Sequence, residues 1–131
     1  LVVEFTESCM IRENERTQAI FRDIRDLGIR IAMDDFGTGY SSLGMLKNSP
    51  ADVVKIDRTF VRDILSSRFD ATFIRFVVEL CHDVNIRVCL EGVEREEEFE
   101  RVRPMNLDYI QGFLFGRPVP ADVFERDFLM P

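Results

Sequence analysis

The sequence predicts an α/β fold in which about five parallel strands alternate with helices. Short apolar runs, often bounded by Gly, Pro, Asn or Asp, are separated by longer stretches with helical periodicity. The runs are nearly continuous in hydrophobicity, as in 29–33, which is typical of parallel strands covered on both faces. The length of 131 residues is too short for a complete (β/α)8 barrel of about 250 residues. The alternatives are therefore a small doubly wound sheet and a large part of a barrel.

Five apolar segments have the length and the boundaries of strands. We expect these strands at residues 1–5, 29–33, 53–56, 86–90 and 109–115.

The segments between them carry apolar residues at helical spacing. This spacing predicts a helix over 14–27, which Gly28 ends, and a second long helix from Phe69 to Val84. Shorter helices are expected at 41–47, at 95–103, where Pro104 closes the helix, and near 123–129.

The composition is that of an acidic globular domain. Lys and Arg number 17 against 24 Asp and Glu, the formal net charge is −7, and 46% of the residues are hydrophobic. A nucleic-acid duplex and an anionic membrane surface both attract clustered cations, so neither is an expected partner. Direct membrane insertion is not expected, because no run approaches the about 20 apolar residues that cross a bilayer. The glutamate run 96–98 is interpreted as a solvated helix face.

The cysteines and the one histidine indicate no metal cluster. Cys9, Cys81 and Cys89 are odd in number and form no C-x-x-C pair, so they are interpreted as buried, reduced thiols of a cytoplasmic protein. His82 lies in a helical pattern without a metal partner nearby in the sequence, and a structural role is expected for it.

Polar residues recur at the end of each predicted strand. Parallel strands bring their C-terminal ends to one edge, which is where ligands bind in β/α folds. One carboxylate at a strand end is typical of a helix cap, but carboxylates at several strand ends favour a ligand site. The residues are Glu4, Glu7, Asp34, Asp35, Lys55, Asp57, Glu91, Glu94 and, within the last strand, Gln111.

The carboxylates of this edge predict a divalent metal site, because like charges held close together need protons or cations to neutralise them. Oxygen ligands without clustered His or Cys select Mg²⁺, Mn²⁺ or Ca²⁺ over zinc. Two neighbouring ions held through Asp34 and Asp35 would suit hydrolysis of a phosphodiester. Lys55 would orient the attacking water or offset phosphate charge, and the alternative is a salt bridge to Asp57 or Asp34.

These residues occur in the order and spacing of the EAL domain, which the sequence resembles over essentially its whole length. The resemblance implies the C-terminal part of a TIM-like barrel, with residues 1–131 as the C-terminal part of an EAL domain. It also implies a phosphodiesterase that hydrolyses the bacterial second messenger cyclic di-GMP to linear pGpG with Mg²⁺ or Mn²⁺. The matching motifs are 4–8 (EFTES), 34–43 (DDFGTGYSSL), 54–57 (VKID), 91–94 (EGVE) and 111–113 (QGF).

The resemblance implies a two-metal site built from four carboxylates. Glu4 and Asp34 would hold the first metal, and Asp34 and Asp35 the second, with Asp57 close by.

The resemblance implies further roles around the metals. Lys55 and Glu91 would position or activate the attacking water, and Gln111 would lie near the substrate at the rim. Glu94 would support the site from behind the direct ligands. Glu7 would anchor a flexible loop that in the family couples dimerisation to metal binding, here Phe36, Gly37, Thr38 and Gly39.

Two features of the family have no counterpart in the chain, the Glu-Ala-Leu signature and a metal-binding Asn, both of which belong upstream of the matched region. With the start at Leu1, which lacks an initiator Met and a signal peptide, this favours the C-terminal part of a longer protein over a stand-alone half-barrel. The isolated chain is expected to have little activity. The parent protein could carry sensory or cyclase domains and could be membrane-anchored through them.

Two alternatives to catalysis stay open. The domain could bind cyclic di-GMP without cutting it, or it could serve as a protein-interaction module. Exposed sheet edges predict a homodimer or larger self-association.

Overall fold

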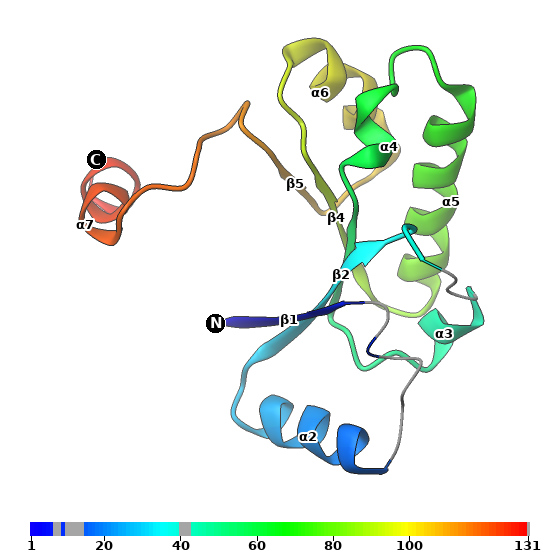
Figure 1. Cartoon of the computed structure of the whole chain (residues 1–131), viewed down its shortest axis with the longest axis vertical. Coiled ribbons are helices and arrows are strands. Elements are labelled where there is room, and N and C mark those ends of the chain that lie inside the picture. Colours follow the sequence, from blue (N-terminus) through cyan, green and yellow to red (C-terminus); the bar gives the residue numbers. More distant parts are fainter. Residues whose placement is uncertain (7–8, 10–14, 40–42, 131) are drawn as a thin grey trace.

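The computed structural model describes residues 1–6, 9, 15–39 and 43–130, and its strands form one parallel sheet. The strands lie side by side in chain order (Figure 1). A doubly wound sheet reverses its strand order at a switch point, whereas this order has no reversal, so the fold is a segment of a β/α barrel. The strands are β1 (Val2–Thr6), β2 (Arg30–Phe36), β3 (Val53–Ile56), β4 (Arg87–Glu91) and β5 (Tyr109–Gln111).

The helices follow the strands as the sequence predicts, with two additions that the periodicity does not reveal. α4 is a single turn too short to give a periodic signal, and η1 begins at Arg103, where Pro104 sits in the first turn and is tolerated. The helices are α2 (Glu15–Asp26), α3 (Gly44–Lys47), α4 (Thr59–Arg62), α5 (Arg68–Asp83), α6 (Glu96–Val102), η1 (Arg103–Met105), α7 (Ala121–Phe124) and η2 (Glu125–Leu129).

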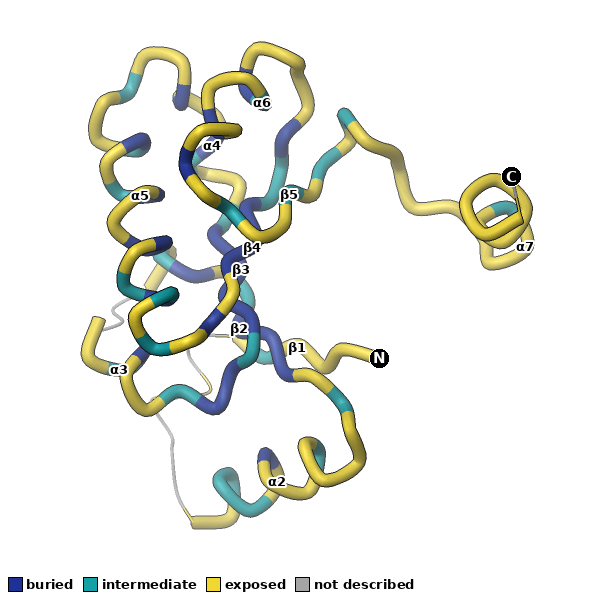
Figure 2. The backbone as a smooth tube through the Cα atoms, turned by 180° about the vertical axis from the view of Figure 1, so that it is seen from behind, coloured by how far each residue is buried: buried dark blue, intermediate teal, exposed yellow. Residues whose placement is uncertain are grey.

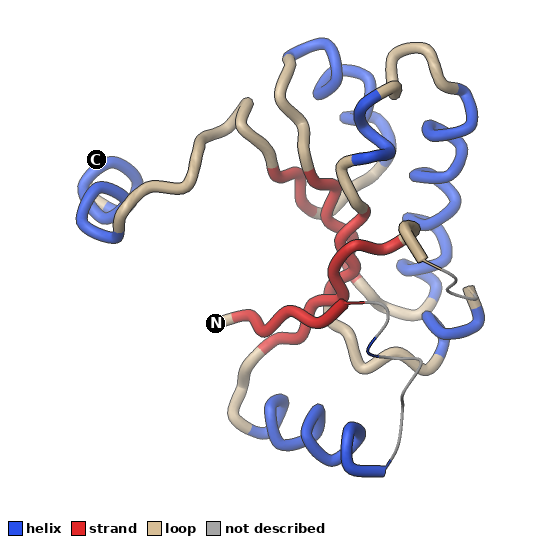
Figure 3. The backbone as a smooth tube through the Cα atoms, viewed as in Figure 1, coloured by secondary structure: helices blue, strands red, loops and turns tan. Residues whose placement is uncertain are grey.

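The two faces of the sheet have different surroundings, because successive side chains of a strand point to opposite faces. One face packs on the helices, which Figure 3 shows beside the strands, and forms the main core with Phe21 of α2 and Ile74 of α5. The other face has a small buried cluster of Ala32, Val53 and Cys89, which includes no helix residue. The sheet residues of the main core are Ile31, Met33, Val54, Ile56, Val88 and Leu90.

Burial is greatest in β2, β3 and β4 and falls off toward both ends of the chain (Figure 2). The segment after β5 runs away from the sheet to α7 (Figure 1). Large apolar side chains are exposed at the β1 edge of the sheet, as the prediction of exposed apolar edges requires, and also in the helical segment that follows β5; they are Leu1, Val2 and Val3 at the edge and Phe124, Phe128, Leu129 and Met130 in the segment. Among the described residues, no helix has both the length and the hydrophobicity of a membrane span.

The predictions for Phe36 and for Cys9 are wrong. Phe36 is the last residue of β2 and is 3% exposed, so it belongs to the core and the loop starts at Gly37. Cys9 is exposed, whereas Cys81 and Cys89 are buried as expected. Burial raises the pKa of the Cys81 thiol to about 12 and that of the Cys89 thiol to about 11, with nearby carboxylates adding to it, so both stay protonated.

Candidate metal centre and active site

Several polar residues near the strand ends share the face of the sheet opposite the main core. Glu4, Lys55 and Glu91 alternate with core residues along their strands, and Glu91 pairs in register with Gln111 of β5. Thr6 of β1 pairs with Asp34 of β2 at the same edge. Strand alternation and register therefore gather these side chains where the sequence predicts a site.

A bulge lets two consecutive acids serve one site. In a regular strand Asp34 and Asp35 would point to opposite faces. Asp35 instead has a φ of 57°, and the register between β2 and β3 shifts between Met33 and Phe36. Asp tolerates this left-handed conformation better than most residues, and such bulges re-aim side chains beside functional sites. The bulge brings the Asp34 and Asp35 carboxylates together and returns Phe36 to the core.

Lys55 is the centre of the polar network. Its Nζ lies 2.8 Å from Glu4 Oε1, 2.8 Å from Glu91 Oε1 and 3.5 Å from Asp34 Oδ1. The residue is only 7% exposed, so its ammonium group is held in place by these partners. The predicted salt bridge to Asp34 is present, and no ion pair with Asp57 is recorded within the described part of the chain.

The network has more acids than its one lysine can neutralise. Burial alone would lower the pKa of Lys55, but hydrogen bonds to Glu4 and Glu91 and the charge of Asp34 raise this pKa above its ordinary value. Burial raises the pKa of Glu91, and the charges of Asp34 and Glu4 add to the rise, while Lys55 opposes it. The surrounding carboxylates thus raise the pKa of Lys55, and they add to the rise that burial causes in the pKa of Glu91.

Three carboxylates are close enough to bind one ion. Oxygen atoms of Asp34, Asp35 and Glu91 all lie within 4.8 Å of one another. An all-oxygen donor set fits Mg²⁺, Mn²⁺ or Ca²⁺ better than zinc. Glu4 is not in this group, whereas Glu91 joins it in addition to its predicted role near the water, and both carboxylates also lie 2.8 Å from the Lys55 ammonium.

Asp57 stands at the end of β3 and has a structural contact as well. Its Oδ1 accepts a hydrogen bond of 2.8 Å from the backbone N–H of Thr59, at the start of α4. This is the capping role that the sequence leaves open for a single strand-end carboxylate. Asp57 also lines the cleft described next.

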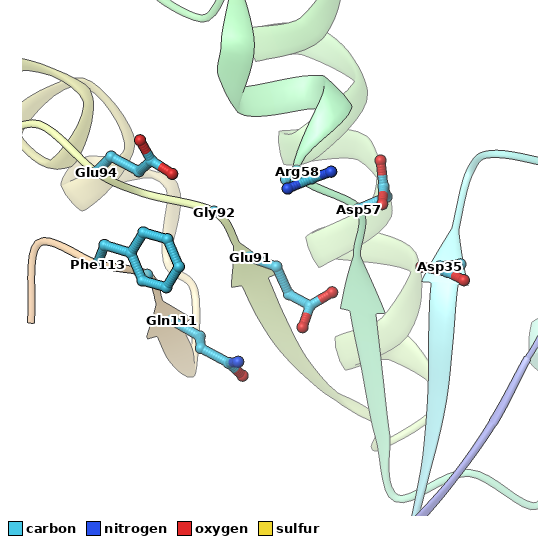
Figure 4. A pocket seen from close by; sticks show the side chains of 9 residues that line it. Asp35, Asp57, Arg58, Glu91, Gly92, Glu94, Gln111 and Phe113 are labelled. Carbon is cyan, nitrogen blue, oxygen red and sulfur yellow. The ribbon is translucent and has the colours of Figure 1, made fainter. Parts of the chain in front are cut away.

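A cleft of about 400 Å³ opens over the ends of β3, β4 and β5 (Figure 4). Figure 4 shows Glu91 and Gln111 extending from adjacent strands, with Asp57 and Asp35 across the opening. The cleft brings five of the predicted site residues together with four neighbours: Asp35, Asp57, Arg58, Glu91, Gly92, Glu94, Gln111, Gly112 and Phe113.

Two glycines allow the chain to fold closely around this cleft. Gly92 has a φ of +81°, and a Cβ there would lie 2.3 Å from Cβ of Arg58. A Cβ at Gly112 would lie 1.9 Å from the carbonyl oxygen of Val93. The same turn is closed by the Gly92 N–H, which donates to the carbonyl of Gln111 at 2.8 Å. The EGVE and QGF motifs therefore need these glycines for a backbone contact.

Of the four neighbours that were not predicted as site residues, Arg58 and Phe113 bring side chains to the cleft. Arg58 directly follows Asp57, and the strand-end position was a usable signal for it. Phe113 carries Arg117 over its ring, 4.1 Å from the centroid, and is 48% exposed at the rim.

The interpretation of the run 96–98 as a solvated face is wrong for Glu98, which is 5% exposed. Its carboxylate accepts hydrogen bonds from the backbone N–H groups of Glu94 (2.9 Å) and Arg95 (3.1 Å), and it pairs with the Arg95 guanidinium at 2.7 Å. Burial alone would raise the pKa of Glu98, but these hydrogen bonds lower it below its ordinary value. Glu98 thus holds the turn that carries Glu94.

The loop after β2 is described only in part. Glu7, its predicted anchor, lies outside the described residues, as do residues 40–42. Thr38 donates its hydroxyl to the carbonyl of Asp35 at 2.8 Å. Gly37 has a φ of +95°, and a Cβ there would lie 2.7 Å from the Phe60 ring, which stacks on Phe73. Gly37, the first residue of the loop, therefore lies against α4 and α5.

His82 lies at the opposite edge of the sheet, away from the cleft. Its Nε2 lies 2.8 Å from Asp108 Oδ2, which also accepts a hydrogen bond of 2.7 Å from the backbone N–H of Val88. His82 therefore ties α5 to the start of β4 and β5, in agreement with the expected structural role.

Comparison with known proteins places the chain in one family. A family model for the EAL domain matches residues 1–118. The cyclic di-GMP phosphodiesterase PdeR of Escherichia coli is 40% identical over 124 residues, which are 95% of this chain and 19% of PdeR.

Solved structures agree with this match. The structure of MucR phosphodiesterase in a c-di-GMP complex has a TM-score of 0.85 at 39% identity and covers 95% of this chain and 50% of that one. Klebsiella pneumoniae BlrP1 in a manganese/cy-diGMP complex has a TM-score of 0.82 at 37% identity, over 89% of this chain and 30% of that one. A calcium/cy-diGMP complex of BlrP1 has a TM-score of 0.81 at the same identity and coverage. The chain thus spans a fifth of PdeR and half of the MucR structure.

Proposed function

The chain belongs to the EAL domain family, and from this premise we propose that its parent protein hydrolyses cyclic di-GMP to linear pGpG with Mg²⁺ or Mn²⁺. The observation that carries the proposal is the group of Asp34, Asp35 and Glu91, whose oxygens lie within 4.8 Å of one another beside Lys55. The names of relatives support the substrate, because PdeR is a cyclic di-GMP phosphodiesterase and the MucR structure is a c-di-GMP complex.

The carboxylates are assigned to two divalent ions. Glu4 and Asp34 would hold one ion and Asp34 and Asp35 the other, with Asp57 nearby and Glu91 within reach of the same group. The donor set fits, since these ligands are carboxylate oxygens, and the manganese and calcium complexes of BlrP1 support an oxygen-binding ion. When bound, such ions polarise the phosphate and lower the pKa of a water molecule.

Lys55 is assigned to orient the water and the scissile phosphate. The raised pKa of Lys55 keeps it protonated, so it donates hydrogen bonds and does not act as a base. Glu4 and Glu91, each 2.8 Å away, hold its ammonium in one position. Asp34 at 3.5 Å links this ammonium to the proposed ligands.

Glu91 is assigned to receive the proton of the attacking water. Its raised pKa moves it toward the range in which a carboxylate can accept a proton at neutral pH. Gln111 is exposed and reaches into the cleft beside Glu91, which suits contact with the substrate (Figure 4). Glu94 would support the cleft wall, where Glu98 holds its backbone.

The remaining expectations stay proposals about the parent protein. A cytoplasmic location follows from a cytoplasmic messenger as substrate, and companion sensory or cyclase domains accord with the name of MucR, a bifunctional diguanylate cyclase/cyclic di-GMP phosphodiesterase of Pseudomonas aeruginosa. The exposed apolar side chains of β1 and of the segment after β5 favour an interaction surface, and with it a homodimer or larger self-association.

Turnover of cyclic di-GMP by the full-length protein tests the proposal. With Mg²⁺ the wild type should form pGpG, a chelator should stop the reaction, and Asp35→Asn should abolish it while thermal unfolding stays cooperative. Undiminished turnover in Asp35→Asn would refute the two-metal assignment. Binding of cyclic di-GMP without turnover in the wild type would favour the non-catalytic binding module instead.

A further inference from the structure

A second hollow adjoins the candidate active site on its outer side. It has a volume of about 360 Å³ and lies between α4 and α6, outside the end of β4. Its lining residues are Arg58, Arg62, Gly92, Glu94, Arg95 and Glu98, and we refer to it as the arginine groove.

The arginine groove has more positively than negatively charged side chains, so it can bind an anionic ligand. Glu98 is satisfied by Arg95 at 2.7 Å and by two backbone N–H groups, so this pair is internally neutral. Arg58 and Arg62 are exposed residues, and within the described ranges neither side chain forms an ion pair or a hydrogen bond. Glu94 is the remaining carboxylate, which leaves a positive balance in the groove.

The groove continues the active-site cleft. Arg58, Gly92 and Glu94 line both hollows, and Figure 4 shows Arg58 between Asp57 and Glu94. The missing side chain at Gly92 lets the Arg58 backbone and Cβ come close, so the base of this side chain is fixed at the boundary. The cleft is acidic, with Asp35, Asp57, Glu91 and Glu94, and the groove beside it is basic.

Hydrolysis makes the phosphate more negative, and a positively charged groove binds a more negative phosphate more tightly. Water adds its oxygen to phosphorus, the bond from phosphorus to the 3′ oxygen breaks, and that oxygen takes up a proton. A diester with one negative charge thereby becomes a terminal monoester with about −1.5 to −2 charges at pH 7. Hydrogen bonds from guanidinium to phosphate are strong and often bidentate.

We propose that the arginine groove is a product subsite, in which Arg58 and Arg62 bind the terminal phosphate monoester of the linear dinucleotide. This inference rests on the proposed function. Ring opening frees the monoester to move out of the cleft past Arg58, and the groove receives it there. The subsite therefore distinguishes a linear dinucleotide that carries a terminal phosphate from one that lacks it.

Calorimetric titration of the full-length protein in Mg²⁺ with pGpG and with GpG, which lacks the terminal phosphate, tests the subsite. The wild type should bind pGpG about tenfold more tightly than GpG, the worth of one charge-assisted contact. Arg62→Gln should reduce this preference, and Arg58→Gln with Arg62→Gln should bring it to within about twofold, while Arg62→Lys retains part of it. The matched control Arg75→Gln, at an exposed position of α5, should keep the full preference.

Equal affinity of the wild type for pGpG and GpG would overturn the inference, as would an unchanged preference in the double variant. Thermal unfolding of each variant checks that lost binding is not lost folding. Turnover of cyclic di-GMP by the wild type is measured separately and reports on the proposed function. A wild type that cleaves cyclic di-GMP but does not discriminate pGpG from GpG refutes the subsite alone.

Discussion

The two edges of the sheet both carry charged side chains, but they use them differently. At the amino edge Asp52 accepts the Ile31 N–H at 2.8 Å, and Arg87 donates to the Tyr109 hydroxyl at 2.8 Å. At the carboxyl edge, Glu4, Asp34 and Glu91 converge on Lys55. Asp52 and Arg87 of the amino edge thus bond to groups of the fold itself, whereas the carboxyl edge has three carboxylates around a single lysine.

One carboxylate at each edge, Asp108 at the amino edge and Glu91 at the carboxyl edge, has a shifted pKa, and the two shifts have opposite signs. At the amino edge burial alone would raise the pKa of Asp108, but His82 and the Val88 N–H lower it, so the ionised form stabilises the fold. At the carboxyl edge the pKa of Glu91 is raised, chiefly by burial, so the ionised form opposes folding. The ionised form of Asp108 thus stabilises the fold, whereas that of Glu91 costs stability and is available to a site. We therefore expect substitutions at the amino edge to affect stability and substitutions at the carboxyl edge to affect activity.

The largest expected effect is the loss of activity when Lys55 is removed. Lys55→Met in the full-length protein should lower the turnover of cyclic di-GMP about 10²- to 10³-fold, because one positioned donor at the reacting centre is lost. Arg87→Met, the amino-edge counterpart, should change turnover by less than about threefold. Steady-state kinetics of both variants measures these effects. Equal losses of turnover in the two variants would contradict the assignment of the site to the carboxyl edge.

A large effect on stability is expected at the turn of the carboxyl edge. Gly112→Ala would place a methyl group 1.9 Å from the Val93 carbonyl oxygen and should lower the free energy of unfolding by about 3 kcal/mol. Gly28→Ala tests backbone strain without a steric clash, because Gly28 has a φ of +74° and no atom lies within 4 Å of a Cβ added there. It should cost about 1 kcal/mol. Urea unfolding measures both, and a cost at Gly112 no greater than that at Gly28 would contradict the close-contact account.

A smaller effect is expected at the amino edge. Asp108→Asn weakens the bonds to His82 and the Val88 N–H and should lower the free energy of unfolding by about 1–2 kcal/mol. Turnover should stay at the wild-type level. The control is Asp83→Asn, an exposed position one residue after His82, where a change within about 0.5 kcal/mol is expected. Thermal unfolding and kinetics are the measurements; a loss of turnover in Asp108→Asn would contradict a purely structural role.

The smallest effect is the pH dependence of that same contribution. Because the folded-state pKa of Asp108 is lowered, its contribution is complete above the unfolded pKa of about 3.9 and is lost as pH falls through the folded-state pKa. The difference in unfolding free energy between wild type and Asp108→Asn should therefore shrink as the pH falls below about 4. A difference that does not shrink in this acid range would contradict the lowered pKa.

The sequence predicts the fold well where local patterns decide it. The apolar run 53–56 coincides with β3, and the strand-end carboxylates lie at one edge because parallel strands leave no other arrangement. The bulge at Asp35 is not predictable in the same way, since alternation along a strand would separate Asp34 from Asp35.

The local sequence pattern also does not predict the role of a residue whose partners are brought to it only by the fold. Glu98 looks like part of a charged helix face, and only the fold of 92–95 turns backbone N–H groups toward it. Arg58 gains its position from Gly92, a residue of another strand end. The exposure of Cys9, likewise, depends on packing that composition does not describe.

The central claim is that the excess charge of the carboxyl edge serves a divalent ion, and the stability of Glu91→Gln tests it most directly. In chelator this variant of the full-length protein should be more stable than the wild type, because the ionised form of Glu91 opposes folding. In saturating Mn²⁺ the order should reverse, because the wild type gains more from the ion. Thermal unfolding in the two buffers measures this, and the same order of stability in both would contradict the claim.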